Sequence, residues 1–251
     1  MNATTTLIST VTGYPTLDPK AVAGARLVIC DLDGCLISEG EPFDDTAAFV
    51  DACGSRLWIV SNCSDTTADT ISERLAGMGF DVPAARILLA GEIAMHHLIK
   101  VEQVHRLRLY AAAPIVEQAV VFGMDLEAHN PEAILLCRDL NVSVETFGLI
   151  LSEVAHGVPL WVANEDLSHP GHDNQPVAET GALLAALCAI RPSLTWQSLG
   201  KPNPTMLAMA LERTGMNPTD AVFVGDNALT DGRAAAAIGM AFIHIQRSPA
   251  R

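Results

Sequence analysis

The sequence predicts an α/β protein in which helices cover both faces of a parallel sheet. Short apolar runs that resemble strands alternate along the chain with longer stretches that resemble helices. Some of these runs, such as residues 221–224 (AVFV), are apolar at every position, which is typical of strands buried on both faces. With 251 residues, of which 49% are hydrophobic, the chain can bury the core of one large domain or two smaller ones.

Each predicted strand is a short apolar run that ends at polar or turn-forming residues. In chain order, the predicted strands are residues 26–32, 56–62, 86–91, 106–112, 133–138, 159–164, 221–227 and 241–246. The predicted helices between them are residues 65–78, 92–103, 143–156, 181–190, 204–215 and 230–239. This alternation favours parallel strands joined by helical crossovers.

Two polar stretches interrupt the alternation in the second half of the chain. Residues 164–180 are rich in turn formers and are predicted to form a long exposed loop. Residues 191–204 contain three prolines and are predicted to connect back into regular structure. We therefore predict that residues 103–192 form an inserted domain, and that residues 1–102 and 193–251 form the main domain.

Composition and charge narrow the classes of function. The formal net charge of −14 counts against nucleic acid or an anionic membrane as a partner, because both require a basic surface. The longest apolar stretches are shorter than a membrane span, and the N-terminus does not resemble a secretory signal. The six cysteines lack paired metal-binding spacing, which is typical of reduced thiols. We therefore expect a soluble cytoplasmic protein with no nucleic-acid or membrane partner.

Polar residues occupy three predicted strand ends and two helix starts. They are, in chain order, Asp31, Asp33, Ser61, Asn62, Lys201, Asp226, Asn227 and Asp231. In open α/β sheets, reactive groups collect beyond the carboxyl ends of the strands. Each group alone is explained by a turn or a helix cap. The whole set in this order is hard to explain in that way and predicts a catalytic site.

This set resembles the four motifs of the haloacid dehalogenase (HAD) superfamily, and specifically its NagD-like, nitrophenylphosphatase-like branch (subfamily IIA). The matching segments are DLDGCL, VSNCS, GKPNP and VGDNALTD. The resemblance implies a Rossmann-like core and an inserted α/β cap of the C2 type. The chain between Asp33 and Ser61 is too short for a cap, whereas the chain between Ser61 and Lys201 is long enough. The inserted domain is therefore expected to be that cap.

The resemblance implies a phosphatase that works through an aspartyl-phosphate intermediate. In this interpretation Asp31 is the nucleophile, and Asp33 protonates the leaving oxygen and then activates water. Ser61 and the backbone amide of Asn62 hold phosphate oxygens beside a helix N-terminus. Lys201 stabilises the developing negative charge.

The resemblance also implies a Mg²⁺ ion bound by Asp31, Asp226 and the backbone carbonyl of Asp33, all of them oxygen ligands. The ion would screen the nucleophile from the incoming phosphate. Asp231 is expected to orient metal-bound water or Lys201, unless it only stabilises a helix N-terminus by its charge.

The expected function is Mg²⁺-dependent hydrolysis of small phosphorylated metabolites, such as sugar or polyol phosphates, nucleoside monophosphates or pyridoxal phosphate. The second aspartate, Asp33, favours phosphoryl chemistry over dehalogenation, because halide needs no proton to leave. Two alternatives stay open: a phosphotransferase of the same superfamily, and a non-catalytic ligand-binding protein on this scaffold. The natural substrate is also open, and the resemblance favours a homodimer formed through the cap.

Within the cap, Asn164 and Asp166 are the expected substrate-recognition residues, because they match an Asn-x-Asp stretch of the branch. The alternative is a solvated loop with self-capping turns. His169 and His172 in the same loop are expected to be exposed polar residues rather than metal ligands.

Two cysteines depart from the pattern of the branch. Cys35 stands where threonine or valine is common, and Cys63 where asparagine or a small residue is usual. Both substitutions preserve size, so catalysis is expected to survive. Either thiol would make the enzyme sensitive to oxidation only if it were both exposed and acidic.

Overall fold

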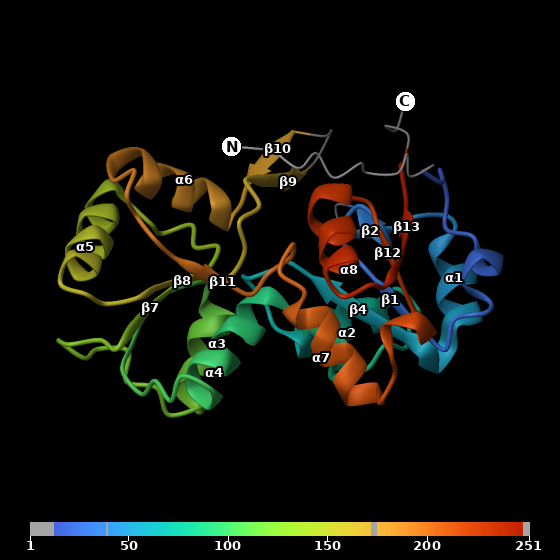
Figure 1. The fold of residues 1–251 in the computed structure, drawn as a ribbon, viewed down its shortest axis with the longest axis horizontal. Helices are drawn as coiled ribbons and strands as arrows, with labels where there is room; N and C mark the ends of the chain where they lie inside the picture. Colours follow the sequence, from blue (N-terminus) through green and yellow to red (C-terminus); the bar gives the residue numbers. More distant parts are fainter. Residues whose placement is uncertain (1–12, 39, 172–174, 248–251) are drawn as a thin grey trace.

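The computed structural model describes residues 13–38, 40–171 and 175–247. In it, the predicted strands form two separate sheets (Figure 1). The larger sheet has the strand order β13–β12–β1–β4–β5, and the smaller has the order β11–β8–β7–β6. Every pairing within these two sheets is parallel. The predicted α/β class with a parallel sheet is confirmed.

The larger sheet is covered by helices on both faces. Its strands are β1 (Leu27–Cys30), β4 (Leu57–Ser61), β5 (Ile87–Leu89), β12 (Ala221–Gly225) and β13 (Ala241–His244). Its helices are α1 (Thr46–Cys53), α2 (Ala68–Gly77), α3 (Ala90–Lys100), α7 (Thr205–Thr214) and α8 (Arg233–Ala237). Alternate residues of β1 point to opposite faces: Ile29 packs in the cluster that includes α3 and α7, and Cys30 packs with α1 and α2. This two-sided burial explains why β1 is wholly apolar up to Asp31.

The smaller sheet is built in the same way. Its strands are β6 (Leu107–Tyr110), β7 (Ala133–Leu136), β8 (Leu160–Val162) and β11 (Gln197–Ser198), and its helices are α4 (Ala113–Val121), α5 (Val144–Ala155) and α6 (Thr180–Ile190). One face packs against α5 and α6 through Leu136 and Val162. The other packs through Leu135 and Trp161 against α4 and also against α3, in the same apolar cluster as the larger sheet. Helix α3 therefore supports both sheets.

Short elements complete the chain. Two antiparallel hairpins are formed by β2 (Ile37–Ser38) with β3 (Glu41–Pro42), and by β9 (Ser168–Pro170) with β10 (Pro176–Ala178). Short 3₁₀ turns lie at Pro19–Val22, Gly54–Arg56, Ala84–Arg86 and Pro218–Asp220, and a π-helical turn, Ala228–Gly232, leads into α8. These elements have too few residues to show a period of their own, so the sequence pattern did not reveal them.

One structural prediction was wrong. Residues 164–180 do not form a long exposed loop, because they contain the β9–β10 hairpin and begin and end at buried residues, Asn164 and Thr180. The turn-forming composition did not indicate these two short strands, which pair with each other. His172 lies outside the described residues.

Two further points concern the extent of the elements. Strand β11 pairs with β8 although it lies beyond residue 192, so the smaller sheet extends past the predicted end of the insertion. The division into residues 1–102 with 193–251 and residues 103–192 stays a prediction. Among the described helices, none combines the length and the apolar character that crossing a membrane requires.

Candidate active site

The carboxyl ends of three neighbouring strands bring the predicted core residues together. Asp31 follows β1, Asn62 follows β4 and Asp226 follows β12, and β1 pairs directly with both other strands. They open onto a cavity of about 590 Å³. The predicted residues that line it are Asp31, Asp33, Ser61, Asn62, Asp166, Lys201, Asp226 and Asn227.

Lys201 is buried between two carboxylates. Its Nζ lies 2.7 Å from Asp31 Oδ1 and 2.8 Å from Asp231 Oδ1, and it donates to the carbonyl of Val60 at 3.2 Å. Burial acts to lower the pKa of Lys201, but the charges of Asp231 and Asp31 outweigh it and raise the pKa above its ordinary value. The ammonium therefore stays charged beside the nucleophile candidate.

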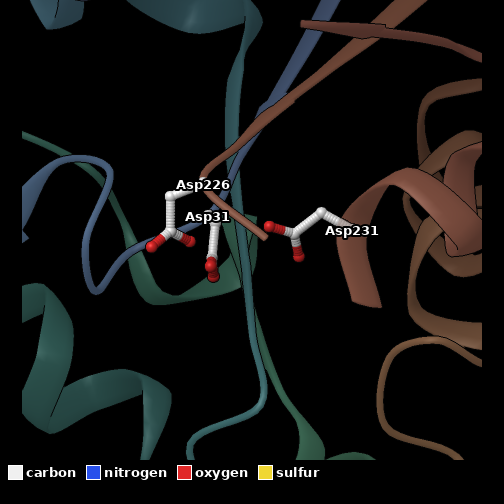
Figure 2. Close-up of side chains that lie close together, drawn as sticks. All are labelled: Asp31, Asp226 and Asp231. Atoms are coloured by element: carbon white, nitrogen blue, oxygen red, sulfur yellow. The ribbon is translucent and has the colours of Figure 1, made fainter. Parts of the chain in front are cut away.

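Three aspartates meet around this lysine. Asp226 and Asp231 lie on either side of Asp31 (Figure 2), and one oxygen of each lies within 4.8 Å of the others. Burial raises the pKa of Asp31 well above its usual value, and Lys201 opposes that rise. Burial, followed by the charge of Asp231, raises the pKa of Asp226 to about 6. The cluster therefore carries more buried negative charge than Lys201 alone compensates.

A divalent cation fits this donor set. The ligand atoms are carboxylate oxygens, which Mg²⁺ prefers. Asp231 is fully buried, and its carboxylate is engaged by Lys201 and by the backbone N–H of Asn227 at 3.1 Å. Asp31 and Asp226, which both line the cavity, are therefore the carboxylates placed to bind an ion.

The loop after β1 needs glycine at position 34. Gly34 has a φ of +77°, a conformation that side chains disfavour, and a Cβ there would overlap the carboxylate of Asp226. Its neighbour Asp33 stands at the exposed rim of the cavity. The surrounding protein partly excludes water from Asp33, and this desolvation raises its pKa, whereas a charge on His169 opposes the rise. Asp33 therefore lies within electrostatic reach of the β9–β10 hairpin.

Asn62 ties the loop after β4 to the segment that carries Lys201. Its Oδ1 accepts from the backbone N–H of Lys201 at 2.7 Å, and its Nδ2 donates to the carbonyl of Lys201 and to Asp166 Oδ2, both at 2.9 Å. Ser61 Oγ accepts from the N–H of Cys63 at 3.1 Å, which closes the loop. These hydrogen bonds fix Ser61 and Lys201 relative to each other.

The two predicted cap residues differ in position. Asp166 is half-buried and lines the cavity, and burial raises its pKa while the bond from Asn62 opposes this. Asn164 is buried and is not among the lining residues. Its Nδ2 donates to the carbonyl of Asn62 at 2.7 Å and to Thr180 Oγ1 at 3.3 Å. Asn164 thus joins the end of β8 to the loop after β4.

The sequence interpretation missed part of the cavity wall. His169 is not an exposed loop residue, because it is half-buried and lines the cavity with Nδ1 only 2.6 Å from Glu179 Oε1. Arg138, Glu179 and Arg74 also line the cavity. Arg138 stands two residues beyond the end of β7, so applying the strand-end rule to the smaller sheet would have found it.

Neither cysteine beside the motifs meets the condition for easy oxidation. Cys35 is buried, and the hydrogen bond with Cys30 together with burial raises its pKa well above the usual value. Cys63 is half-buried, and burial raises its pKa as well. Because the thiolate is the reactive form, both thiols are expected to be slow to oxidise.

Two family models match the chain at the segments that build this site. The model described as haloacid dehalogenase-like hydrolase matches residues 28–125, and the model described as HAD-hydrolase-like matches residues 198–248. The chain belongs to the haloacid dehalogenase-like hydrolases. Within them it falls in the branch of NagD and the nitrophenylphosphatases, as the motif resemblance implied.

Three similar proteins illustrate the relationship. This hydrolase is 24% identical to a dihydroxyacetone phosphatase of Corynebacterium glutamicum, over 87% of this chain and 80% of the relative. A 4-nitrophenylphosphatase from Thermotoga maritima has a TM-score of 0.80 at 23% identity, over 88% and 85% of the two chains. A glycerol phosphate phosphatase from Mycobacterium tuberculosis, solved with magnesium, has a TM-score of 0.78 at 21% identity, over 88% and 68%. These structural likenesses show that the fold is shared.

Proposed function

We propose that this hydrolase is a Mg²⁺-dependent phosphatase of small phosphorylated metabolites. One observation carries the proposal: a buried, charged Lys201 bridges Asp31 and Asp231 at the cavity where Asp31 meets Asp226. If the pair of Lys201 and Asp231 were only structural, it would not need a second carboxylate, Asp31, on the side that faces the cavity. The names of similar proteins, which include phosphatases of dihydroxyacetone phosphate, glycerol phosphate and nitrophenyl phosphate, support the same class.

In the proposed reaction Asp31 attacks phosphorus, and its carboxylate becomes an aspartyl-phosphate as the ester oxygen leaves. Asp33, at the rim, gives its proton to that oxygen and then takes one from the water that hydrolyses the intermediate. The pKa of Asp33 is raised by desolvation, which is the direction that favours the role of general acid. Ser61 and the amide of Asn62 hold phosphate oxygens, and Lys201 balances charge on phosphate and nucleophile.

The ion would be held by Asp31, Asp226 and the carbonyl of Asp33. When bound, Mg²⁺ supplies positive charge that lowers the repulsion between the aspartates and the phosphate dianion. Asp231 holds the ammonium of Lys201 in place, and the backbone N–H of Asn227 holds Asp231. Asp231 and the backbone of Asn227 therefore keep Lys201 in position.

The smaller sheet with its helices and the β9–β10 hairpin is proposed to be the cap that recognises the non-phosphate part of the substrate. Asp166, His169 and Glu179 lie on its side of the cavity. Sugar and polyol phosphates, nucleoside monophosphates and pyridoxal phosphate all stay candidate substrates, and the homodimer through the cap stays a prediction.

The test is hydrolysis of 4-nitrophenyl phosphate by the purified chain, with Mg²⁺ and with a chelator, followed by a panel of phosphorylated metabolites. Metal-dependent turnover that Asp31→Asn abolishes is expected. Beryllium fluoride, which mimics a phosphoryl group on a carboxylate, should be found on Asp31 in a crystal. Turnover that survives Asp31→Asn would disprove the proposed nucleophile, and the absence of turnover on any ester would disprove the phosphatase.

A further inference from the structure

Arg138 connects the two sides of the cavity. Its backbone N–H donates to Ser64 Oγ at 3.0 Å, and its guanidinium donates through Nη1 to Asp65 Oδ2 at 2.5 Å. Ser64 and Asp65 belong to the loop after β4, three and four residues beyond Ser61. On its other side the guanidinium Nε donates to the carbonyl of Ala178 at 3.1 Å. One side chain thus bridges the phosphate-side loop and the end of the β9–β10 hairpin.

The bridge continues to an imidazole in the cavity wall. Arg138 Nε lies 3.4 Å from Glu179 Oε1, and the same oxygen lies 2.6 Å from His169 Nδ1. The side chain of Glu179 is only 12% exposed, so its carboxylate needs these two partners to offset the cost of burial. The bond to Nδ1 fixes the orientation of the ring and leaves Nε2 as the nitrogen that Glu179 does not engage. His169 is therefore held by a chain of contacts that begins at Asp65.

We infer that Arg138 is a positioning residue, which anchors Glu179 and through it His169 at a fixed distance from the reaction centre by bridging to Asp65. This rests on the proposed phosphatase function: in that proposal His169, which lines the cavity on the cap side, contacts the non-phosphate part of the substrate, and Arg138 holds it there. The planar guanidinium suits the role, since it donates to Asp65 and to the carbonyl of Ala178 in fixed directions while its charge faces Glu179, which an ammonium does not do. Small displacements of groups that position a substrate cost rate out of proportion to their size.

The experiment is a double-mutant cycle on kcat/KM for 4-nitrophenyl phosphate with Mg²⁺, using Arg138→Gln, His169→Ala and the double variant. Each single variant is expected to lose roughly tenfold, the scale of one lost charged hydrogen bond. The double variant is expected to lose little more than either single one, because both substitutions remove the same contact, that of a correctly placed His169 with the substrate. The same variants are then compared on acetyl phosphate, whose acyl group is much smaller, and the loss there is expected to be several-fold less.

The matched control is Arg108→Gln. Arg108 forms a half-buried ion pair with Glu153 in the smaller sheet, with Nε 2.9 Å from Oε1, but neither residue lines the cavity. It is expected to leave both activities within twofold of the unmodified enzyme. Arg138→Lys covers the case in which the glutamine variant does not fold, since it keeps the charge, and it is expected to behave like Arg138→Gln.

Three results would overturn the inference while the phosphatase stands. The first is losses that multiply in the double variant, and the second is equal losses on both substrates. The third is an Arg138→Lys enzyme with unmodified kinetics. If the unmodified chain itself hydrolyses no phosphate ester, the proposed function fails, and that failure is distinguishable because no variant is involved.

Discussion

The two parallel sheets share one construction but end in different residues. The strands of the larger sheet are followed by carboxylates and an amide, at Asp31, Asn62 and Asp226. Three strands of the smaller sheet, β7, β8 and β11, are followed by small or apolar residues and then by Arg138, Asn164 and Lys201. All three contact the loop after β4, so the carboxyl ends of the two sheets meet at the same site. The larger sheet therefore presents the carboxylates, whereas the smaller sheet adds Lys201 after β11 and holds the loop after β4 through Arg138 and Asn164.

Removing the reacting carboxylate is the strongest test of this division. Asp31→Asn is expected to lower kcat by at least about 10³-fold, because no other side chain takes over a covalent role. The measurement is steady-state hydrolysis of 4-nitrophenyl phosphate. Substitutions of Arg138 or Asn164 should not approach this loss. A comparable loss in Asn164→Ala would erase the distinction between the two sheets.

Metal binding should depend on carboxylates that follow strands of the larger sheet. A saturating excess of Mg²⁺, at about 100 times its dissociation constant, adds about 2.7 kcal/mol of stability, or roughly 5–10 °C in Tm for a chain of this size. Differential scanning fluorimetry with Mg²⁺ and with a chelator measures the shift. Asp226→Asn is expected to abolish it, because one of the two cavity-lining carboxylates is lost. The matched variant Asp166→Asn should keep it.

The sequence predicted the larger sheet and its site better than the smaller one. Asp31, Asn62 and Asp226 could be recognised because strand ends in a parallel sheet converge, and each of them directly follows a strand made largely of apolar residues. The partners of Asn164 and His169 depend on how the β9–β10 hairpin folds back. No local pattern encodes that, since the hairpin strands have three residues each and turn-forming neighbours. Tertiary contacts decided these positions.

A substitution of Asn164 tests whether the smaller sheet holds the loop after β4 in place. Asn164→Ala removes the donor to the carbonyl of Asn62 and leaves that buried oxygen without its partner, which costs about 1–3 kcal/mol. The free energy of unfolding should fall by this amount, and kcat/KM should fall roughly tenfold as the loop after β4 relaxes. Asn141→Ala, an exposed asparagine in the turn before α5, is the control and should change neither quantity. A stability loss with unchanged kinetics would mean that Asn164 supports the fold but not the site.

The smallest effect on activity is expected at an ion pair of the smaller sheet that does not line the cavity. Arg108 and Glu153 form an ion pair with side chains 27% and 21% exposed, and neither lines the cavity. Arg108→Gln should lower the free energy of unfolding by about 1–3 kcal/mol, because it leaves half-buried Glu153 without this partner and removes the hydrogen bonds to the carbonyls of Leu126 and Ala128. Chemical denaturation measures the loss, and kcat/KM should stay within twofold. A clear kinetic defect here would mean that the whole smaller sheet, rather than only the ends of its strands, determines the geometry of the site.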